Sequence, residues 1–144
     1  MKNHWIVVAD ASRARVYSSD PLGRTLEPVT ALDHPDSRKR SSELATDDRG
    51  RARSGVTHVA FEAGTDPAEH AHHLFAVEVA ELLAKGHGEG RYAELWLAAP
   101  PRFLGMLRDE LRDDVRRCVV REVPRDYTQA EPADLPRLFE AHAA

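Results

Sequence analysis

Residues 5–17 read WIVVADASRARVY, and this stretch decides the fold. Its first five residues form a continuous apolar run rich in β-branched side chains, which is typical of a strand covered on both faces. The next three residues, 10–12, predict a turn. Residues 13–17 then alternate, with Ala14 and Val16 on one face and the arginines and the tyrosine on the other. This alternation predicts a second, half-buried strand, so the chain opens with a β-hairpin.

Three further segments carry strand patterns. Residues 26–34 form a third strand, and Pro28 places it at a sheet edge because proline has no amide hydrogen to donate. Residues 95–98 and 119–123 are short apolar runs that predict a fourth and a fifth strand.

Apolar side chains at helical spacing predict three helices. The first begins near Asp66, which can cap it, and ends at Gly86 and Gly88. Its inner stripe is Ala71, Phe75, Val79, Leu82 and Leu83. The second opens at Pro100-Pro101, with Leu104, Leu107, Leu111 and Val115 as its stripe, and the third spans about residues 133–142.

The expected order of elements is therefore β-β-β-α-β-α-β-α. The three leading strands predict an antiparallel meander, and the later β-α-β units predict parallel strands with right-handed crossovers. We expect an α/β protein: a single three-layer domain over residues 1–144, with a five-stranded mixed sheet of ribonuclease-H-like topology.

The bulk properties narrow the functional classes. The net charge of −4 argues against a general nucleic-acid coat, which would be basic overall. Cys118 is the only cysteine, so a disulfide within the chain or a multi-cysteine zinc site is excluded. The apolar run at residues 5–9 is too short for a signal peptide, and no apolar run approaches 18 residues. We expect a cytoplasmic protein without a membrane partner.

Residues 35–57 show no hydrophobic periodicity and are rich in serine, glycine, arginine and aspartate, which predicts a long exposed loop. Between Asp36 and Arg53 six basic residues stand against four acidic ones, a net of +2, so the rest of the chain carries −6. The basic residues are Arg38, Lys39, Arg40, Arg49, Arg51 and Arg53. Arginines spaced in this way can reach several phosphates, although most charge runs are solvated surface.

Several segments resemble the bacterial host attachment protein family: the opening hairpin, residues 47–51 (DDRGR), residues 97–108 (LAAPPRFLGMLR) and residues 125–128 (RDYT). The resemblance covers nearly the whole chain, and residues 97–108 are its most specific part. This family is similar to the middle domain of archaeal and eukaryotic class I release factors, which carries a Gly-Gly-Gln loop to the peptidyl-transferase centre. The resemblance implies binding to RNA or the ribosome. Its name implies a role in attachment to host cells.

The matching loop departs from the release-factor pattern. Residues 35–57 contain Gly50 and Gly55 but no glutamine, and the only glutamine of the chain is Gln129. Hydrolysis by the release-factor mechanism is therefore not expected. Arg102 follows the fourth strand at its carboxyl end, where ligands of open α/β sheets bind, and is expected to join the loop arginines in binding RNA or a partner.

Other constellations support enzymes only weakly. His70 and His73 share a helix face with Glu69 and are weak candidates for metal ligands, as is Asp10 at the end of the first strand. Arginines 116 and 117 beside Cys118 could lower the pKa of its thiol. Asp10 is better explained as a turn former, and the cysteine as a buried apolar side chain.

The sequence thus predicts a non-catalytic RNA- or ribosome-binding module with no cofactor. A metal-dependent hydrolase or nuclease on a ribonuclease-H-like sheet remains an alternative, as does an adaptor that binds a protein partner.

Overall fold

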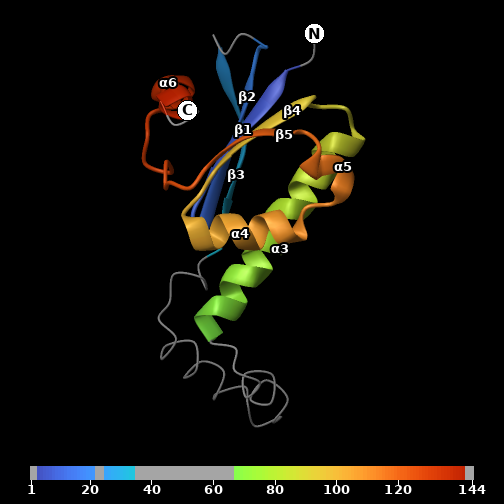
Figure 1. The fold of residues 1–144 in the computed structure, drawn as a ribbon, viewed down its shortest axis with the longest axis vertical. Helices are drawn as coiled ribbons and strands as arrows, with labels where there is room; N and C mark the ends of the chain where they lie inside the picture. The colour runs from blue at the N-terminus through green and yellow to red at the C-terminus, as the bar shows by residue number, and fades with distance from the viewer. Residues whose placement is uncertain (1–2, 22–24, 35–66, 142–144) are drawn as a thin grey trace.

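The computed structural model describes residues 3–21, 25–34 and 67–141, which build one mixed sheet with helices on both faces (Figure 1). The strands are β1 (His4–Ala9), β2 (Arg13–Ser19), β3 (Leu26–Asp33), β4 (Glu94–Ala98) and β5 (Val119–Val123). Their order across the sheet is β3-β2-β1-β4-β5. The α/β class and the five-stranded mixed sheet are therefore confirmed, whereas the ribonuclease-H-like assignment stays a prediction.

The pairing of the strands follows the expected pattern. β1 pairs antiparallel with β2, and β2 pairs antiparallel with β3, which makes the leading meander. β1 pairs parallel with β4, and β4 pairs parallel with β5. β3 lies at the edge as Pro28 predicted, and Pro28 pairs with Tyr17 where the register shifts by one residue. A shift there leaves room for a residue that cannot donate to the ladder.

The two faces of the sheet support separate apolar clusters because side chains alternate along a strand. Trp5, Val7 and Ala9 of β1 pack with α3 (Pro67–Gly88) and α4 (Pro101–Glu110). Ile6 and Val8 face the other side and pack with α6 (Leu135–Ala141). Every residue of β1 is buried, as its apolar run predicted.

The expectation that Tyr17 lies on an exposed face of β2 is wrong. Alternation placed it with the two arginines on an exposed face, but Tyr17 is buried and packs in the cluster of Ile6 and α6. The face is covered at this point by a helix that lies more than a hundred residues later in the sequence. Arg13 and Arg15, on the same face, are only half buried.

The long helix α3 carries the predicted stripe. Ala71, Phe75, Val79 and Leu83 are buried, and Leu82 is partly buried. The cap proposed at Asp66 lies outside the described residues. The helix does not stop at Gly86, which is buried inside its last turn.

The second predicted helix is divided in two. α4 ends at Glu110, and Leu111 adopts an extended conformation as its C-cap. The short helix α5 (Asp113–Arg116) then begins, with Val115 on its buried side. All four residues of the predicted stripe are buried even so, because the break reorients the chain without changing the face it presents to α3.

The C-terminal helix is also shorter than expected. A 3-10 turn, η3 (Pro132–Asp134), precedes α6, in which Leu135 and Phe139 are buried. Of the helices in the described ranges, none has both the length and the apolar character needed to cross a bilayer.

Candidate functional site

The basic segment lies outside the described residues. This applies to six of the predicted RNA-contacting residues, which are Arg38, Lys39, Arg40, Arg49, Arg51 and Arg53. Their proposed role therefore stays a prediction, as does the exposed loop at residues 35–57.

Arg102 lies near the start of α4 and forms an ion pair with Glu69, in the first turn of α3. Its side chain is still 74% exposed, so the ion pair leaves part of the guanidinium open to solvent. The contact links the two helices that cover one face of the sheet. Exposed pairs of this kind contribute about 0–1 kcal/mol to stability.

The side chains that were weak candidates for metal ligands form other contacts. His73 Nε2 lies 3.3 Å from Glu110 Oε1, a second contact between α3 and α4, while Glu69 pairs with Arg102 and His70 is exposed. Within residues 3–21, 25–34 and 67–141, no three His, Cys, Asp or Glu side chains are placed to hold a metal ion. The histidines of α3 are not brought together with Asp10.

Asp10 organises the turn between β1 and β2. Its Oδ1 accepts hydrogen bonds from the amide of Ser12 at 2.8 Å, the hydroxyl of Ser12 at 3.1 Å and the amide of Arg13 at 2.8 Å. Its Oδ2 lies 3.7 Å from Arg13 Nε. The interpretation of Asp10 as a turn former is confirmed.

Two of the segments that carry the family resemblance also have structural tasks. Asp126 Oδ1 accepts hydrogen bonds from the amide of Thr128 at 2.9 Å and from its hydroxyl at 2.5 Å, which fixes the turn before η3.

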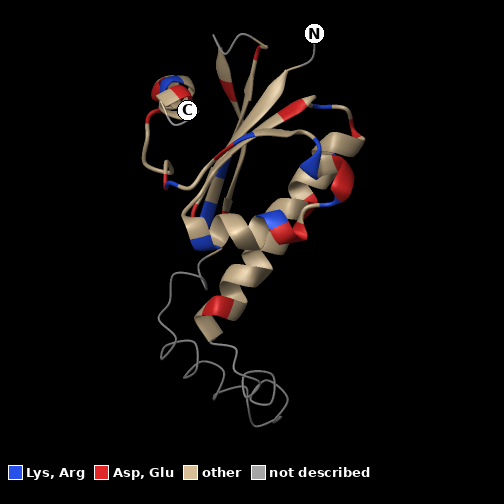
Figure 2. Ribbon diagram, viewed as in Figure 1, with Lys and Arg blue, Asp and Glu red and all other residues tan. Residues whose placement is uncertain are grey.

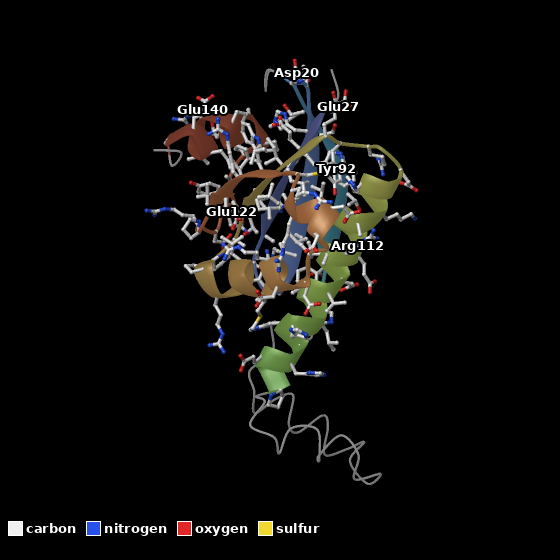
Figure 3. The ribbon with its side chains drawn as sticks, turned by 45° about the vertical axis from the view of Figure 1, so that its right-hand side comes forward. Asp20, Glu27, Tyr92, Arg112, Glu122 and Glu140 are labelled. Carbon is white, nitrogen blue, oxygen red and sulfur yellow. The ribbon has the colours of Figure 1, made fainter. Side chains whose placement is uncertain are left out.

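In the run at residues 97–108, Phe103 and Leu104 are buried under α3. Arg108 donates to Glu122 on β5, at 3.0 Å from its Nε (Figure 3). Both basic and acidic residues lie along α4 and α5 (Figure 2).

A cysteine, a histidine and an aspartate lie in line between α3, α5 and β5. Cys118 Sγ lies 3.6 Å from His87 Nδ1, and His87 Nε2 lies 3.6 Å from Asp114 Oδ2. The sequence alone does not predict this cluster, because His87 precedes Cys118 by 31 residues and no local pattern joins them. The order of the groups is that of a nucleophile, a base and an orienting carboxylate.

The raised pKa of the Cys118 thiol argues against a nucleophilic role for this cluster. Burial, followed by the Asp114 carboxylate, raises the pKa of the Cys118 thiol, and the opposing effect of Arg117 is smaller. The thiol also lies 3.5 Å from the carbonyl oxygen of Asp114. The expectation that neighbouring arginines would lower this pKa is therefore wrong. A thiol held in its neutral form is a poor nucleophile.

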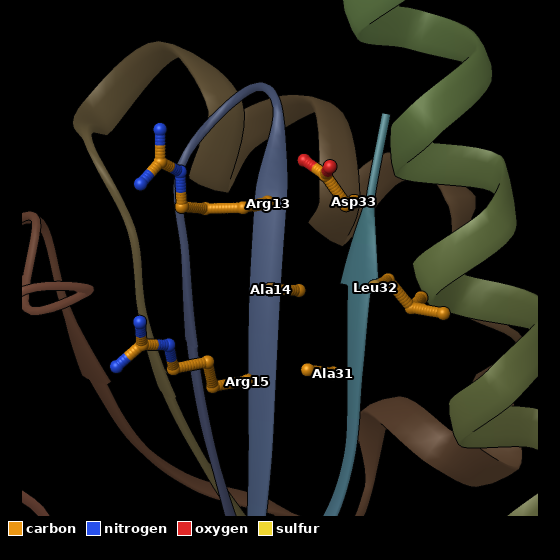
Figure 4. Close-up of a pocket in the computed structure, with 6 residues that line it drawn as sticks. All are labelled: Arg13, Ala14, Arg15, Ala31, Leu32 and Asp33. Carbon is orange, nitrogen blue, oxygen red and sulfur yellow. The ribbon is translucent and has the colours of Figure 1, made fainter. Parts of the chain in front are cut away.

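A shallow pocket of about 270 Å³ lies on the face of the sheet that α6 shares (Figure 4). It is lined by Arg13, Ala14, Arg15, Ala31, Leu32 and Asp33, all from β2 and β3. Figure 4 shows both arginines pointing to the same side of the sheet, whereas Leu32 points toward α3. The sequence placed Arg13 and Arg15 on one face but gave no sign that the face would be hollow there.

The comparison with known families agrees with the resemblance found in the sequence. The profile of a family described as "Protein required for attachment to host cells" matches residues 5–138, more than nine-tenths of the chain. No curated protein gives a significant match. The relationship to release factors stays a prediction. The chain belongs to the family of proteins required for attachment to host cells.

Proposed function

We propose that the chain is a non-catalytic binding module that associates with RNA or the ribosome in the cytoplasm. One observation carries the proposal: positive charge is concentrated in one segment of an acidic protein. Residues 36–53 have a net charge of +2, while the remainder carries −6. The proposal includes a relationship to the release-factor middle domain and a ribonuclease-H-like topology of the sheet.

This distribution of charge suits an anionic polymer. Each phosphate neutralised by arginine or lysine releases counterions and adds affinity that falls as salt rises. The acidic remainder repels the same polymer, so binding would be confined to the basic segment and to groups close to it. Arginine also matches phosphate geometry, because its planar guanidinium donates two parallel hydrogen bonds.

The residues that an enzyme would need take part in structural contacts instead. Three hydrogen bonds to its own turn occupy Oδ1 of Asp10, which a metal-dependent nuclease would need as a ligand. His73 contacts Glu110, and the thiol of Cys118 favours its neutral form. These contacts therefore do not support the alternative of a metal-dependent hydrolase.

The family description gives the biological context, a requirement for attachment to host cells. We infer that a cytoplasmic RNA-binding module contributes to attachment indirectly, by acting on the synthesis of the proteins that make contact with the host. Deleting the gene should reduce attachment, and the wild-type chain should restore it. Restoration by a variant that no longer binds RNA would separate attachment from RNA binding and contradict this link.

The direct test removes the central arginines. Replacing Arg49, Arg51 and Arg53 with alanine should weaken binding to a labelled single-stranded RNA, measured by fluorescence anisotropy. The slope of log affinity against log salt should fall by about 2, since each phosphate that an arginine neutralises adds about 0.7 to it. The melting temperature should not change.

A matched control removes the same charge elsewhere. Arg91, Arg117 and Arg137 are exposed and lie outside the basic segment. Replacing these three with alanine should leave the salt slope unchanged. Equal reductions of the slope in the two triple variants would mean that only net charge matters, and the assignment to residues 35–57 would fail.

A further inference from the structure

The pocket on β2 and β3 contains the guanidinium of Arg15, which has no partner among the residues that the structure describes. Arg15 lies opposite Val8 of β1 on one side and Ala31 of β3 on the other. Among the described residues, Arg15 takes part in no hydrogen bond, ion pair or ring contact. It is half buried. Each guanidinium has five N–H donors, so Arg15 can donate to a ligand at this position.

Small apolar neighbours create the space around Arg15. The row of residues across this face of the sheet is Ala31, Arg15, Val8, Ala98 and Val123. Ala31 has only a methyl group where a longer side chain would fill the pocket. Figure 4 shows the Arg15 side chain on the same side of the sheet as that of Arg13, pointing away from α3. The site is therefore open to a ligand and presents charged donors to it.

Arg13 lies one pleat further along the same face and is only loosely paired. Its Nε is buried and donates no hydrogen bond to any residue whose structure is described, although Asp10 Oδ2 lies 3.7 Å away. The other oxygen of Asp10 accepts the three hydrogen bonds of the turn, which hold the carboxylate in place. Arg13 thus has donors left over beside those of Arg15.

The neighbouring carboxylates restrict the kind of anion. Asp33 lies opposite Arg13 in the register of the two strands, and Asp10 Oδ2 lies 3.7 Å from Arg13 Nε. Two guanidinium groups thus face two carboxylates, and the local charge is close to zero. A doubly charged phosphate would meet carboxylate repulsion, whereas a singly charged group can use the directional donors of Arg15. The volume of about 270 Å³ is slightly below the range of about 300–1,000 Å³ that is typical of small-molecule sites.

We infer that Arg15, assisted by Arg13, binds a singly charged phosphodiester in the pocket between β2 and β3. The inference rests on the proposed function, because RNA is the source of the phosphodiester. It adds a fixed contact on the sheet to the basic segment. The recognition is a charge-assisted pair of hydrogen bonds from a planar guanidinium to two phosphate oxygens.

The first experiment needs no variant. Side-chain Nε–Hε signals of the wild-type protein are followed by NMR during titration with a short single-stranded RNA, and separately with inorganic phosphate and with acetate. The signal of Arg15 should shift with RNA at lower ligand concentrations than with either small anion. If the Arg15 signal does not move with saturating RNA, the inference is overturned.

The second experiment compares matched single variants. Arg15→Ala should weaken RNA binding roughly tenfold, as expected when one charge-assisted pair of hydrogen bonds is removed, and Arg15→Lys should recover only part of it. Arg117→Ala removes an exposed arginine outside the pocket and should have little effect. Equal effects of Arg15→Ala and Arg117→Ala would overturn the inference and leave the proposed function standing.

The two proposals can fail separately. If the wild-type protein binds no RNA but the Arg15 signal shifts with inorganic phosphate, the proposed function fails and the pocket remains an anion site. If acetate shifts Arg15 as readily as RNA does, the pocket selects carboxylates, and the phosphodiester assignment is wrong.

Discussion

Gly86 of α3 packs directly against the indole ring of Trp5 on β1. A Cβ atom at position 86 would lie 2.5 Å from Cη2 of Trp5 and 3.1 Å from Cε1 of Tyr92. Trp5 is 1% exposed, and Tyr92 is held by a 2.5 Å hydrogen bond from its hydroxyl to the carbonyl oxygen of Leu83 (Figure 3). Neither ring can move away without disturbing the core.

Gly86→Ala should therefore destabilise the protein. Overpacking costs about 1–3 kcal/mol, and the better helix propensity of alanine returns up to about 1 kcal/mol. We expect a net decrease of about 1–2 kcal/mol in the free energy of unfolding, measured by urea denaturation. Gly88→Ala is the matched control, because a Cβ there meets nothing within 4 Å. A Gly86→Ala protein as stable as the control would show that the helix does not approach Trp5 so closely.

His4 should make the protein less stable in mild acid. It is 3% exposed, and its ring is stacked on Trp96 with centroids 4.6 Å apart. Its Nε2 has no hydrogen-bond partner in the described part of the chain. Burial lowers the pKa of His4 below its ordinary value of 6.5, although Glu94 and Asp20 act in the opposite direction.

The direction in which stability changes with pH follows from proton linkage. The unfolded chain binds the proton more tightly, so stability is fully present above pH 6.5 and is lost as the pH falls from there toward the folded pKa. His4→Phe keeps an aromatic ring and should flatten the stability profile below pH 6.5. The same profile in His4→Phe and in wild type would contradict this assignment. His70→Gln, which changes an exposed histidine, serves as control.

The thiol of Cys118 should react slowly at neutral pH. Because burial and Asp114 raise its pKa, alkylation by iodoacetamide should accelerate only above the range of an ordinary cysteine. Asp114→Asn removes the carboxylate charge and should shift the rate profile to lower pH. Rapid alkylation of the wild-type protein at pH 7, in the native state, would instead identify an activated nucleophile in the Cys118, His87 and Asp114 cluster.

Asp10 should matter for stability rather than for metal-dependent chemistry. Asp10→Ala removes the acceptor of three hydrogen bonds in the turn and should cost about 1–3 kcal/mol of unfolding free energy. Asp10→Asn keeps an oxygen at the same place and should lose much less. Magnesium binding is measured by calorimetry for the wild type and for Asp10→Ala. If the wild type binds magnesium and Asp10→Ala loses this binding while it remains stable, this view is contradicted.

Local patterns in the sequence were enough to predict the framework. The unbroken apolar run of β1, the alternation in β2 and the proline in β3 predicted a central strand, its partner and an edge. What alternation could not predict is the cover over Tyr17, since α6 reaches it from the far end of the chain. The break at Leu111 was also missed, because the apolar spacing continues through Val115 across the bend.

The candidate site was less predictable because its contacts join distant segments. The cluster of His87, Asp114 and Cys118 forms only when α3 packs beside α5. The position of Arg102 after β4 predicted that it would lie near a ligand site. Its ion pair with Glu69 was not predicted, because this contact depends on how α3 and α4 pack. The pocket at Arg15 depends on Ala31 in the neighbouring strand, and register decides which residue lies there.

The central claim is that this protein associates with RNA through concentrated positive charge. Co-sedimentation of the wild-type chain with ribosomes, measured from about 50 to 200 mM salt, tests it most directly. We predict that the chain pellets with ribosomes at the lowest salt and is released steeply as salt rises. A chain that remains in the supernatant at the lowest salt would contradict the claim.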